Sequence, residues 1–169
     1  MAAAAADGPS PAPEDVARAQ GLELTDALRE PRGAFVTLTA GGHLRGCIGS
    51  IVSDEPLADT VVASAASAAV ADPRFPAVGP DEVDGLAIEV SALTPPRTVN
   101  GPDDIEIGRH GILLSRGPHR AVFLPQVAPE QGWDLPTTLT HLARKAGLAP
   151  DAWRSGCRFE VFEAEICKE

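Results

Sequence analysis

Residues 33–50 read GAFVTLTAGGHLRGCIGS, and they predict the β-hairpin around which the rest of the chain is organised. The first part, residues 33–39, is rich in the aromatic and β-branched residues that favour strands. Residues 40–42 supply the permissive backbone of a tight turn, and a second strand follows from His43. Because a hairpin joins neighbouring antiparallel strands, we expect an antiparallel or mixed sheet at the centre of the fold.

The second strand of this hairpin carries the first candidate site. Side chains alternate between the two faces of a strand, so His43, Arg45 and Cys47 are expected to share one face. Leu44 and Ile48 are then expected on the opposite, buried face. The exposed face would therefore present a cation, a thiol and an imidazole close together.

Two interpretations of Cys47 follow from its neighbours. In the first, Gly46 and Gly49 remove side chains beside Cys47, so that a ligand can approach, and the Arg45 guanidinium favours the reactive thiolate. In the second, Cys47 is a buried residue that acts as a small hydrophobe, and Arg45 pairs with a carboxylate. The spacing alone favours the second interpretation, whereas the first makes Cys47 and Arg45 catalytic.

The other elements follow from hydrophobic periodicity and from proline and glycine boundaries. Helices are expected over residues 14–30, 56–72 and 135–146, with Asp54 and Asp134 as N-caps of the last two, and strands over residues 86–92, 112–115, 121–124 and 159–166. Helices and strands are interspersed, yet hairpins join several strands, so the fold class is α+β with helices flanking an antiparallel or mixed sheet. Residues 95–104 are the expected boundary between two lobes.

Length and composition limit the function classes. The 169 residues suffice for one ordinary domain or two small lobes, and the net charge of -10 argues against a general nucleic-acid-binding protein. Three cysteines exclude a disulfide framework and a four-thiolate zinc site, and the four histidines lack metal-ligand spacing. Motifs of serine hydrolases, zinc proteases, P-loop NTPases and dinucleotide-binding proteins are absent, so no metal site is expected and no cofactor is identified.

Hydropathy and the N-terminal composition favour a cytoplasmic protein. No window approaches the ~18 apolar residues that cross a bilayer, so no membrane association is expected. Residues 1–13 are rich in Ala and Pro and lack the positively charged start of a secretion signal. We expect a flexible N-terminal tail over residues 1–13 and a single domain over residues 14–169.

A second candidate site lies in the segment 108–120, which contains three arginines, two histidines and no acidic residue. In an acidic chain, this local reversal of charge is typical of a site for a small anion such as phosphate or carboxylate. The alternative is a solvated hairpin whose arginines pair with acidic neighbours such as Asp103, Asp104 and Glu106. Arg109 and His110 are the candidates for substrate binding in this segment.

Three more polar residues are candidates for substrate binding. Arg74 follows the end of a predicted helix, where it either binds the last helix carbonyls or projects towards a ligand. Gln126 follows a strand and offers both a donor and an acceptor to a planar group. Glu130 lies in the next loop and suits a base or a partner for Arg45. Each has an alternative explanation as a polar loop residue, which is favoured for Glu130.

The hexapeptide Leu44-Arg45-Gly46-Cys47-Ile48-Gly49 resembles the signature of the AMMECR domain family, whose prokaryotic members are called AmmeMemoRadiSam system protein A. The resemblance continues, in the family's order, through six more motifs: DPRFP (72–76), IEVS (88–91), IGRHG (107–111), LPQV (124–127), GWD (132–134) and KAGL (145–148). Because these motifs cover roughly residues 33–165, the chain is identified as a member of this family.

The resemblance implies a two-lobed α+β fold with a smaller second lobe and with the hexapeptide strand at a cleft between the lobes. It implies an association with a Memo-like protein and a radical S-adenosylmethionine protein, and it implies no reaction. Our first hypothesis is a cleft enzyme for a small anionic or nucleotide-like molecule, which Arg74, His110 and Gln126 would position beside Cys47 and Arg45. The alternative is a non-catalytic module that binds a ligand or a partner of the same gene system.

Overall fold

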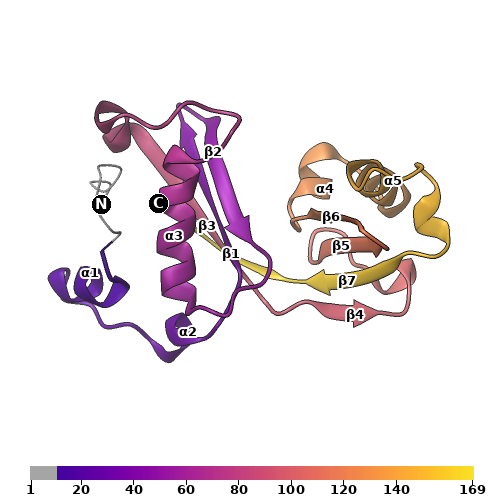
Figure 1. The fold of residues 1–169 in the computed structure, drawn as a ribbon, viewed down its shortest axis with the longest axis horizontal. Coiled ribbons are helices and arrows are strands. Elements are labelled where there is room, and N and C mark those ends of the chain that lie inside the picture. Colours follow the sequence, from indigo (N-terminus) through magenta and orange to yellow (C-terminus); the bar gives the residue numbers. More distant parts are fainter. Residues whose placement is uncertain (1–10) are drawn as a thin grey trace. The chain divides into compact units, whose positions relative to one another are not determined.

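The computed structural model describes residues 11–169, which form two compact units (Figure 1). The first unit contains the chain up to Leu93 together with Glu165–Glu169, and the smaller second unit is Thr94–Ala164. Each unit contains a four-stranded antiparallel sheet, which confirms the predicted α+β class and its two-lobed organisation. The chain first passes between the units just before the predicted boundary at residues 95–104.

The sheet of the first unit has the strand order β2-β1-β3-β8. The strands are β1 (Ala34–Ala40), β2 (His43–Ser50), β3 (Leu86–Leu93) and β8 (Ala164–Lys168). β1 and β2 form the predicted hairpin, and β1 pairs on its other side with β3. The helix α3 (Leu57–Val70) packs against one face of this sheet, where Val36, Leu38 and Ala68 are buried (Figure 1).

The small side chains of α3 let its backbone lie close to β2. A Cβ atom added to Gly46 would lie 2.1 Å from the carbonyl oxygen of Ala68, so only glycine fits at this position of the strand. The helix predicted over residues 56–72 is confirmed, but the prediction that Asp54 caps it is wrong, because Pro56 occupies the N-cap position.

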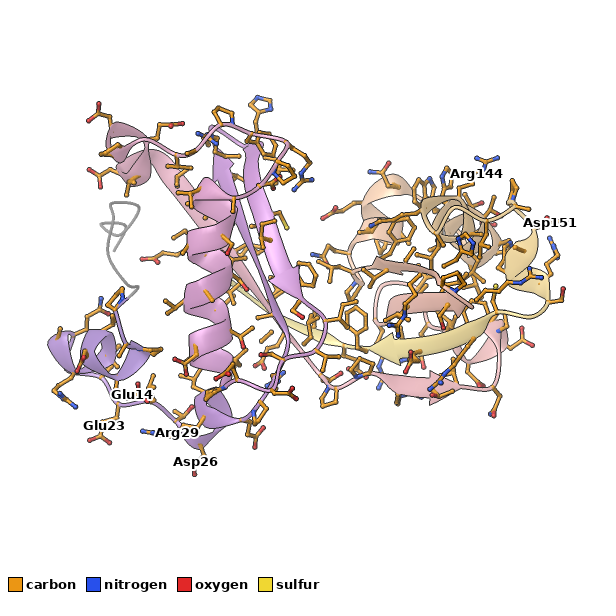
Figure 2. All side chains as sticks on the ribbon, viewed as in Figure 1. Glu14, Glu23, Asp26, Arg29, Arg144 and Asp151 are labelled. Atoms are coloured by element: carbon orange, nitrogen blue, oxygen red, sulfur yellow. The ribbon has the colours of Figure 1, made fainter. Side chains whose placement is uncertain are left out.

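The single helix predicted over residues 14–30 is wrong. Two short helices, α1 (Pro13–Ala19) and α2 (Asp26–Arg29), occupy this segment. They are separate because Gly21 has a φ of +71°, a left-handed conformation that ends a helix. Glu14 of α1 and Arg29 of α2, both labelled in Figure 2, form an ion pair with a distance of 3.8 Å.

The predicted tail falls largely outside the described part of the chain. Residues 1–10 are not described, so the expected flexibility of residues 1–13 stays a prediction. Within residues 11–169, no helix has both the length and the hydropathy that crossing a bilayer requires.

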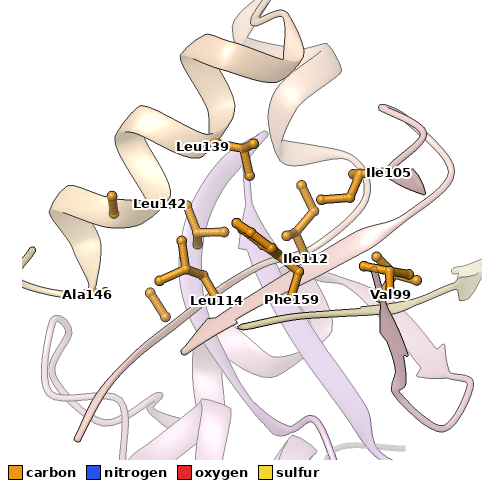
Figure 3. Packing of buried hydrophobic residues seen from close by; sticks show 11 residues of the cluster. Val99, Ile105, Ile112, Leu114, Leu139, Leu142, Ala146 and Phe159 are labelled. Carbon is orange, nitrogen blue, oxygen red and sulfur yellow. The ribbon is translucent and has the colours of Figure 1, made fainter. Parts of the chain in front are cut away.

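The sheet of the second unit has the strand order β4-β7-β5-β6. Its strands are β4 (Arg97–Val99), β5 (Gly111–Arg116), β6 (His119–Phe123) and β7 (Arg158–Phe162). The helices α4 (Val127–Gln131) and α5 (Leu135–Lys145) lie between β6 and β7 in the chain, and α5 packs against the sheet. Short 3-10 helices span Pro80–Gly85 in the first unit and Pro102–Asp104 and Ala152–Arg154 in the second. The core between α5 and the sheet includes five large side chains shown in Figure 3: Ile112, Leu114, Leu139, Leu142 and Phe159.

Both ends of α5 lie where the sequence predicts them. The carboxylate of Asp134 accepts a hydrogen bond from the N–H of Thr137 at 2.9 Å, as an N-cap does. Gly147, with a φ of +75°, follows the other end of the helix in the left-handed conformation that ends helices. Local signals are therefore sufficient to place this helix.

The single final strand predicted over residues 159–166 is wrong. It is divided into β7 and β8, which belong to different sheets. At the division, the N–H of Thr94 donates to the Glu163 carbonyl and the N–H of Glu163 donates to Thr94 Oγ1, both at 2.9 Å. Alternating apolar residues indicate extended backbone, but they do not show which sheet the backbone joins.

Candidate functional site

A β-bulge in the hairpin alters the geometry of the hexapeptide. Leu38 of β1 pairs with Gly46, whereas the next residue, Thr39, pairs with Leu44. Arg45 is therefore an extra residue in β2 that has no partner in β1.

The bulge reverses the predicted faces of the residues that precede it. Leu44 lies on the same face as Cys47, and His43 lies on the opposite face, with the residues that face α3. The prediction that His43, Arg45 and Cys47 share one face is therefore wrong. The expected burial of Leu44 is wrong as well, because this side chain is 42% exposed.

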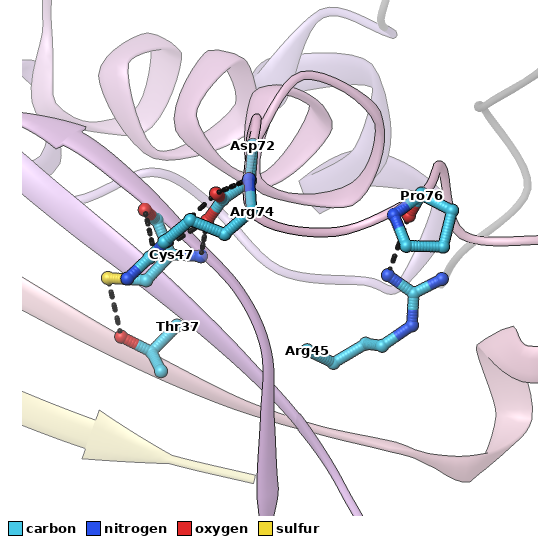
Figure 4. Close-up of polar contacts among 6 residues, drawn as sticks. All are labelled: Thr37, Arg45, Cys47, Asp72, Arg74 and Pro76. Carbon is cyan, nitrogen blue, oxygen red and sulfur yellow. Dashed lines mark hydrogen bonds and ion pairs between the residues drawn. The ribbon is translucent and has the colours of Figure 1, made fainter.

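Arg45 binds the loop that follows α3 instead of the thiol. Its Nε and Nη2 atoms donate to the Glu82 carboxylate at 2.9 and 3.0 Å. Its Nη1 and Nη2 atoms also donate to the carbonyls of Pro76 (2.8 Å) and Ala77 (3.2 Å). Only 13% of the Arg45 side chain is exposed, and Figure 4 shows it directed to Pro76 and away from Cys47. Arg45 thus holds β2 against this loop, as the alternative with a carboxylate partner predicts.

Cys47 lies on an edge strand of its sheet, and residues of the loop after α3 form hydrogen bonds with its backbone N–H and carbonyl (Figure 4). The Cys47 N–H donates to Asp72 Oδ2 (2.9 Å), and the Cys47 carbonyl accepts from Arg74 Nη2 (3.3 Å). Arg74 binds Asp72 through Nε (2.9 Å) and Nη2 (2.6 Å). The Asp72–Arg74 ion pair therefore takes the place of a neighbouring strand at this point of the sheet edge.

The ion pair also brings a permanent cation to Cys47. The hydrogen bonds from Arg74, and then the one from the Cys47 N–H, hold the pKa of Asp72 well below its ordinary value. The same pairing raises the pKa of Arg74. Asp72 is buried, whereas 54% of the Arg74 side chain is exposed. The guanidinium that contacts the backbone of Cys47 thus belongs to Arg74, whereas Arg45 binds Glu82.

The face of the first sheet that is opposite α3 carries a row of polar side chains on four adjacent strands. Thr37 pairs with Cys47 on one side and with Glu89 on the other. Thr37 Oγ1 donates to Cys47 Sγ (3.1 Å), and Lys168 Nζ lies 2.7 Å from Glu89 Oε2. We call Cys47, Thr37, Glu89 and Lys168 the thiol row. A half-buried thiol, a hydroxyl, a carboxylate and an ammonium group therefore follow one another across the sheet.

Reasoning from the sequence missed Thr37, Asp72, Glu89 and Lys168. The regular register of this short turn would pair Thr37 with Gly46, and only the bulge at Arg45 moves its partner to Cys47, so no signal in the sequence indicated Thr37. No local signal joins Glu89 or Lys168 to this row, since their strands are far from the hairpin in sequence and meet it only in the sheet.

Arg109 fits the alternative that was proposed for its segment. Its guanidinium binds Glu106 (3.3 Å) and Glu163 (3.1 Å), and 57% of its side chain is exposed. It is therefore a solvated arginine with acidic neighbours. His119 of the same segment is also structural, since its Nδ1 atom contacts the Ala146 carbonyl at the end of α5 (2.9 Å).

The remaining candidates lie in the second unit and differ in their surroundings. His110 is buried, and Nδ1 of its ring accepts a hydrogen bond from the N–H of Glu106 at 3.0 Å. Gln126 precedes α4, and its Oε1 atom is buried without a hydrogen-bond partner among residues 11–169. Glu130 is exposed, but it belongs to the helix α4, so the prediction that it lies in a loop is wrong. Cys47 and Arg74, in contrast, belong to the first unit.

The ion pair of Arg45 predicts an acid-sensitive component of stability. Its hydrogen bonds, followed by the one from the Gly79 N–H, lower the pKa of Glu82 from 4.5 to about 2. A carboxylate with a lowered pKa in the folded state stabilises the fold above its unfolded pKa, and this contribution is lost as the pH falls from 4.5 towards 2. We expect the urea midpoint to fall over this range, and to fall less steeply in Glu82→Gln. An equally steep fall in Glu82→Gln would contradict this assignment.

The sequence of this chain matches a known protein family. The AMMECR1 family model matches residues 9–167, which is nearly the whole chain. The chain belongs to the AMMECR1 family. This membership confirms the family resemblance that the sequence motifs indicated.

Relatives in the AMMECR1 family are similar over most of their length. A protein of Methanosarcina mazei is 46% identical over 167 residues, which cover 96% of this chain and 82% of the relative. Protein MK0488 of Methanopyrus kandleri is 47% identical over 155 residues, which cover 86% of this chain and 75% of the relative. The crystal structure of the uncharacterized protein PH0010 from Pyrococcus horikoshii is also similar, with a TM-score of 0.80 and 37% identity over 92% of this chain and 85% of that one.

Proposed function

We propose that this AMMECR1-family protein is an enzyme that acts on a small anionic molecule through the Cys47 thiol. The observation that carries the proposal is a half-buried thiol beside a charged guanidinium: Arg74 Nη2 binds the Cys47 carbonyl at 3.3 Å. Cys47 is the group that contacts the substrate, as a nucleophile or in proton transfer. Arg74 anchors the anionic part of the substrate.

Each residue around the thiol has a distinct part in this proposal. Arg74 uses Nε and Nη2 to bind Asp72 and Cys47, which leaves Nη1 of a half-exposed side chain for a carboxylate or phosphate. Thr37 is a positioning residue, whose O–H donates to Sγ and suits a sulfur atom that becomes negatively charged in the reaction. The substrate contacts predicted for Arg109, His110, Gln126 and Glu130 stay predictions.

Alkylation with two reagents of different charge tests the proposal. Iodoacetate is an anion and iodoacetamide is neutral, and labelling of each cysteine is followed by peptide mass spectrometry. We expect Cys47 to be labelled before Cys157 and Cys167, and to show a higher iodoacetate-to-iodoacetamide rate ratio than the exposed Cys167. Cys157 serves as a slow reference, because burial raises the pKa of its thiol.

Four variants assign the effect to its causes. Arg74→Gln should lower the rate ratio at Cys47 several-fold, and Arg74→Lys should retain most of it. Thr37→Val should slow both reagents at Cys47, whereas Thr39→Val, on the same face of β1, should leave them unchanged. If Cys47 is inert in the folded protein, or if its rate ratio equals that of Cys167, the proposed function is wrong.

A second candidate is a non-catalytic module that binds a ligand or a partner of the same gene system. The ion pair between Arg45 and Glu82 favours this candidate, because the one cation of the hexapeptide holds the strand in place instead of serving the thiol. The Memo-like and radical S-adenosylmethionine proteins are the proposed partners, and the sequence resemblance supports them. A metabolite that raises the melting temperature of the parent protein and of Cys47→Ser equally would favour this candidate over the enzyme.

A further inference from the structure

A second polar feature surrounds the buried imidazole of His110, which is 3% exposed. Nδ1 of this ring accepts a hydrogen bond from the N–H of Glu106 (3.0 Å), and Nε2 lies 3.3 Å from Arg97 Nη2. Arg97 is an exposed residue at the start of β4, the edge strand of the second sheet. These residues belong to the second unit, and the argument for them does not depend on the Cys47 thiol.

The contact with Glu106 determines which nitrogen of His110 carries the proton. The N–H of Glu106 and the guanidinium of Arg97 are both permanent donors, and a neutral ring accepts at one nitrogen only. The backbone N–H is held in place by the chain and is closer (3.0 against 3.3 Å), whereas the long Arg97 side chain is free to turn, so we assign Nδ1 as the unprotonated nitrogen. A neutral imidazole then carries its single proton on Nε2. The ring of His110 therefore presents an N–H donor towards Arg97.

Arg97 presents a second donor at the same point. A guanidinium has only N–H donors and stays protonated, so Arg97 Nη2 cannot accept the Nε2 proton of His110. Two donors therefore meet at a nitrogen–nitrogen distance of 3.3 Å and cannot form a hydrogen bond with each other. An anionic oxygen that accepts from both groups satisfies this geometry.

We propose that His110 Nε2–H and the Arg97 guanidinium form a binding site for the phosphate or carboxylate group of a small molecule. Arg97 supplies the charge, and within residues 11–169 it forms no ion pair with a carboxylate, in contrast to the neighbouring Arg109. His110 fixes the direction of the hydrogen bond to the anion, because its burial and its bond to Glu106 hold the ring in one orientation.

Nitrogen-15 NMR of the full chain tests both parts of this site. A long-range proton–nitrogen spectrum distinguishes protonated from unprotonated ring nitrogens, and we expect the His110 proton on Nε2. Titration with inorganic phosphate should then shift the His110 signals with a saturable curve. Addition of sodium chloride to the same ionic strength should leave these signals in place.

Two matched variants assign the binding to Arg97. Arg97→Gln should weaken phosphate binding roughly tenfold or more, the magnitude expected when a charged hydrogen bond is lost. Arg120→Gln, which removes another exposed arginine of the same unit, should leave the affinity unchanged. A proton on Nδ1, a titration without saturation, or equal affinities in parent and Arg97→Gln would overturn the proposal.

A parallel titration with acetate shows whether the site binds a carboxylate, a phosphate or both. Saturable shifts of the His110 signals with both ions support a general oxyanion site. A response to one ion only identifies the ligand group as phosphate or as carboxylate. Since the readout is binding at His110, its failure leaves the thiol chemistry proposed for Cys47 unaffected.

Discussion

Replacement of Gly46 by alanine is expected to lower the free energy of unfolding by about 3 kcal/mol. The new Cβ atom would lie 2.1 Å from the Ala68 carbonyl oxygen, and this oxygen belongs to the backbone of α3. A backbone atom inside a helix cannot move aside as the end of a long side chain can. The helix and β2 must therefore separate, which also loosens the packing around Val36 and Leu38. Urea unfolding followed by circular dichroism measures the loss.

Gly85→Ala is the matched control for this substitution. Gly85 has ordinary backbone angles, and a Cβ atom added there meets nothing within 4 Å. We expect its urea midpoint to stay close to that of the parent protein. If Gly46→Ala and Gly85→Ala are equally stable, the close contact between α3 and the hexapeptide strand does not exist in solution.

Replacement of Asp72 by alanine is expected to lower the melting temperature by roughly 5–10 °C. The Asp72 side chain is 2% exposed, and it binds both the Arg74 guanidinium and the N–H of Cys47. Its removal leaves a cation and a backbone donor without their acceptor at the edge of β2. Differential scanning calorimetry of the variant measures the shift.

Two further variants separate the ion pair from a general effect of charge. Asp81→Ala removes an exposed carboxylate from the following 3-10 helix and should change the melting temperature by less than about 2 °C. The double variant Asp72→Ala/Arg74→Ala should be hardly less stable than Asp72→Ala, because the two residues act through one interaction. Additive losses would show that Asp72 and Arg74 stabilise the protein independently.

The elements with complete local signals were predicted well from the sequence. Asp134 and Gly147 mark the ends of α5, and two glycines after Ala40 mark the turn of the hairpin. The helix predicted over residues 14–30 failed because Gly21 adopts a positive φ. A glycine destabilises the interior of a helix, and this was visible in the sequence at Gly21. The residues around it were compatible both with one long helix and with two short ones.

The candidate site was predicted only in part for a related reason. Cys47 was identified, and Arg74 was named as a candidate, but the cation next to the thiol was expected to be Arg45. That expectation assumed regular alternation along β2, and the bulge at Arg45 interrupts it. Thr37 and Asp72 were missed because their proximity to Cys47 arises from strand pairing and from the path of the loop after α3, and Glu89 was missed because it joins the thiol row only through its pairing with Thr37.

The amino-acid sequence by itself determined the family, the α+β class and most of the helices and strands, since these depend on short motifs and on interactions between residues close in the chain. Only the tertiary structure decided which arginine accompanies the thiol, which strands carry the thiol row, and where the last strand changes sheets. Those features depend on hydrogen bonds between segments tens of residues apart, such as Cys47 with Asp72 and Thr94 with Glu163. Such bonds have no local pattern, because either partner could satisfy its polar group elsewhere until the fold brings the two together.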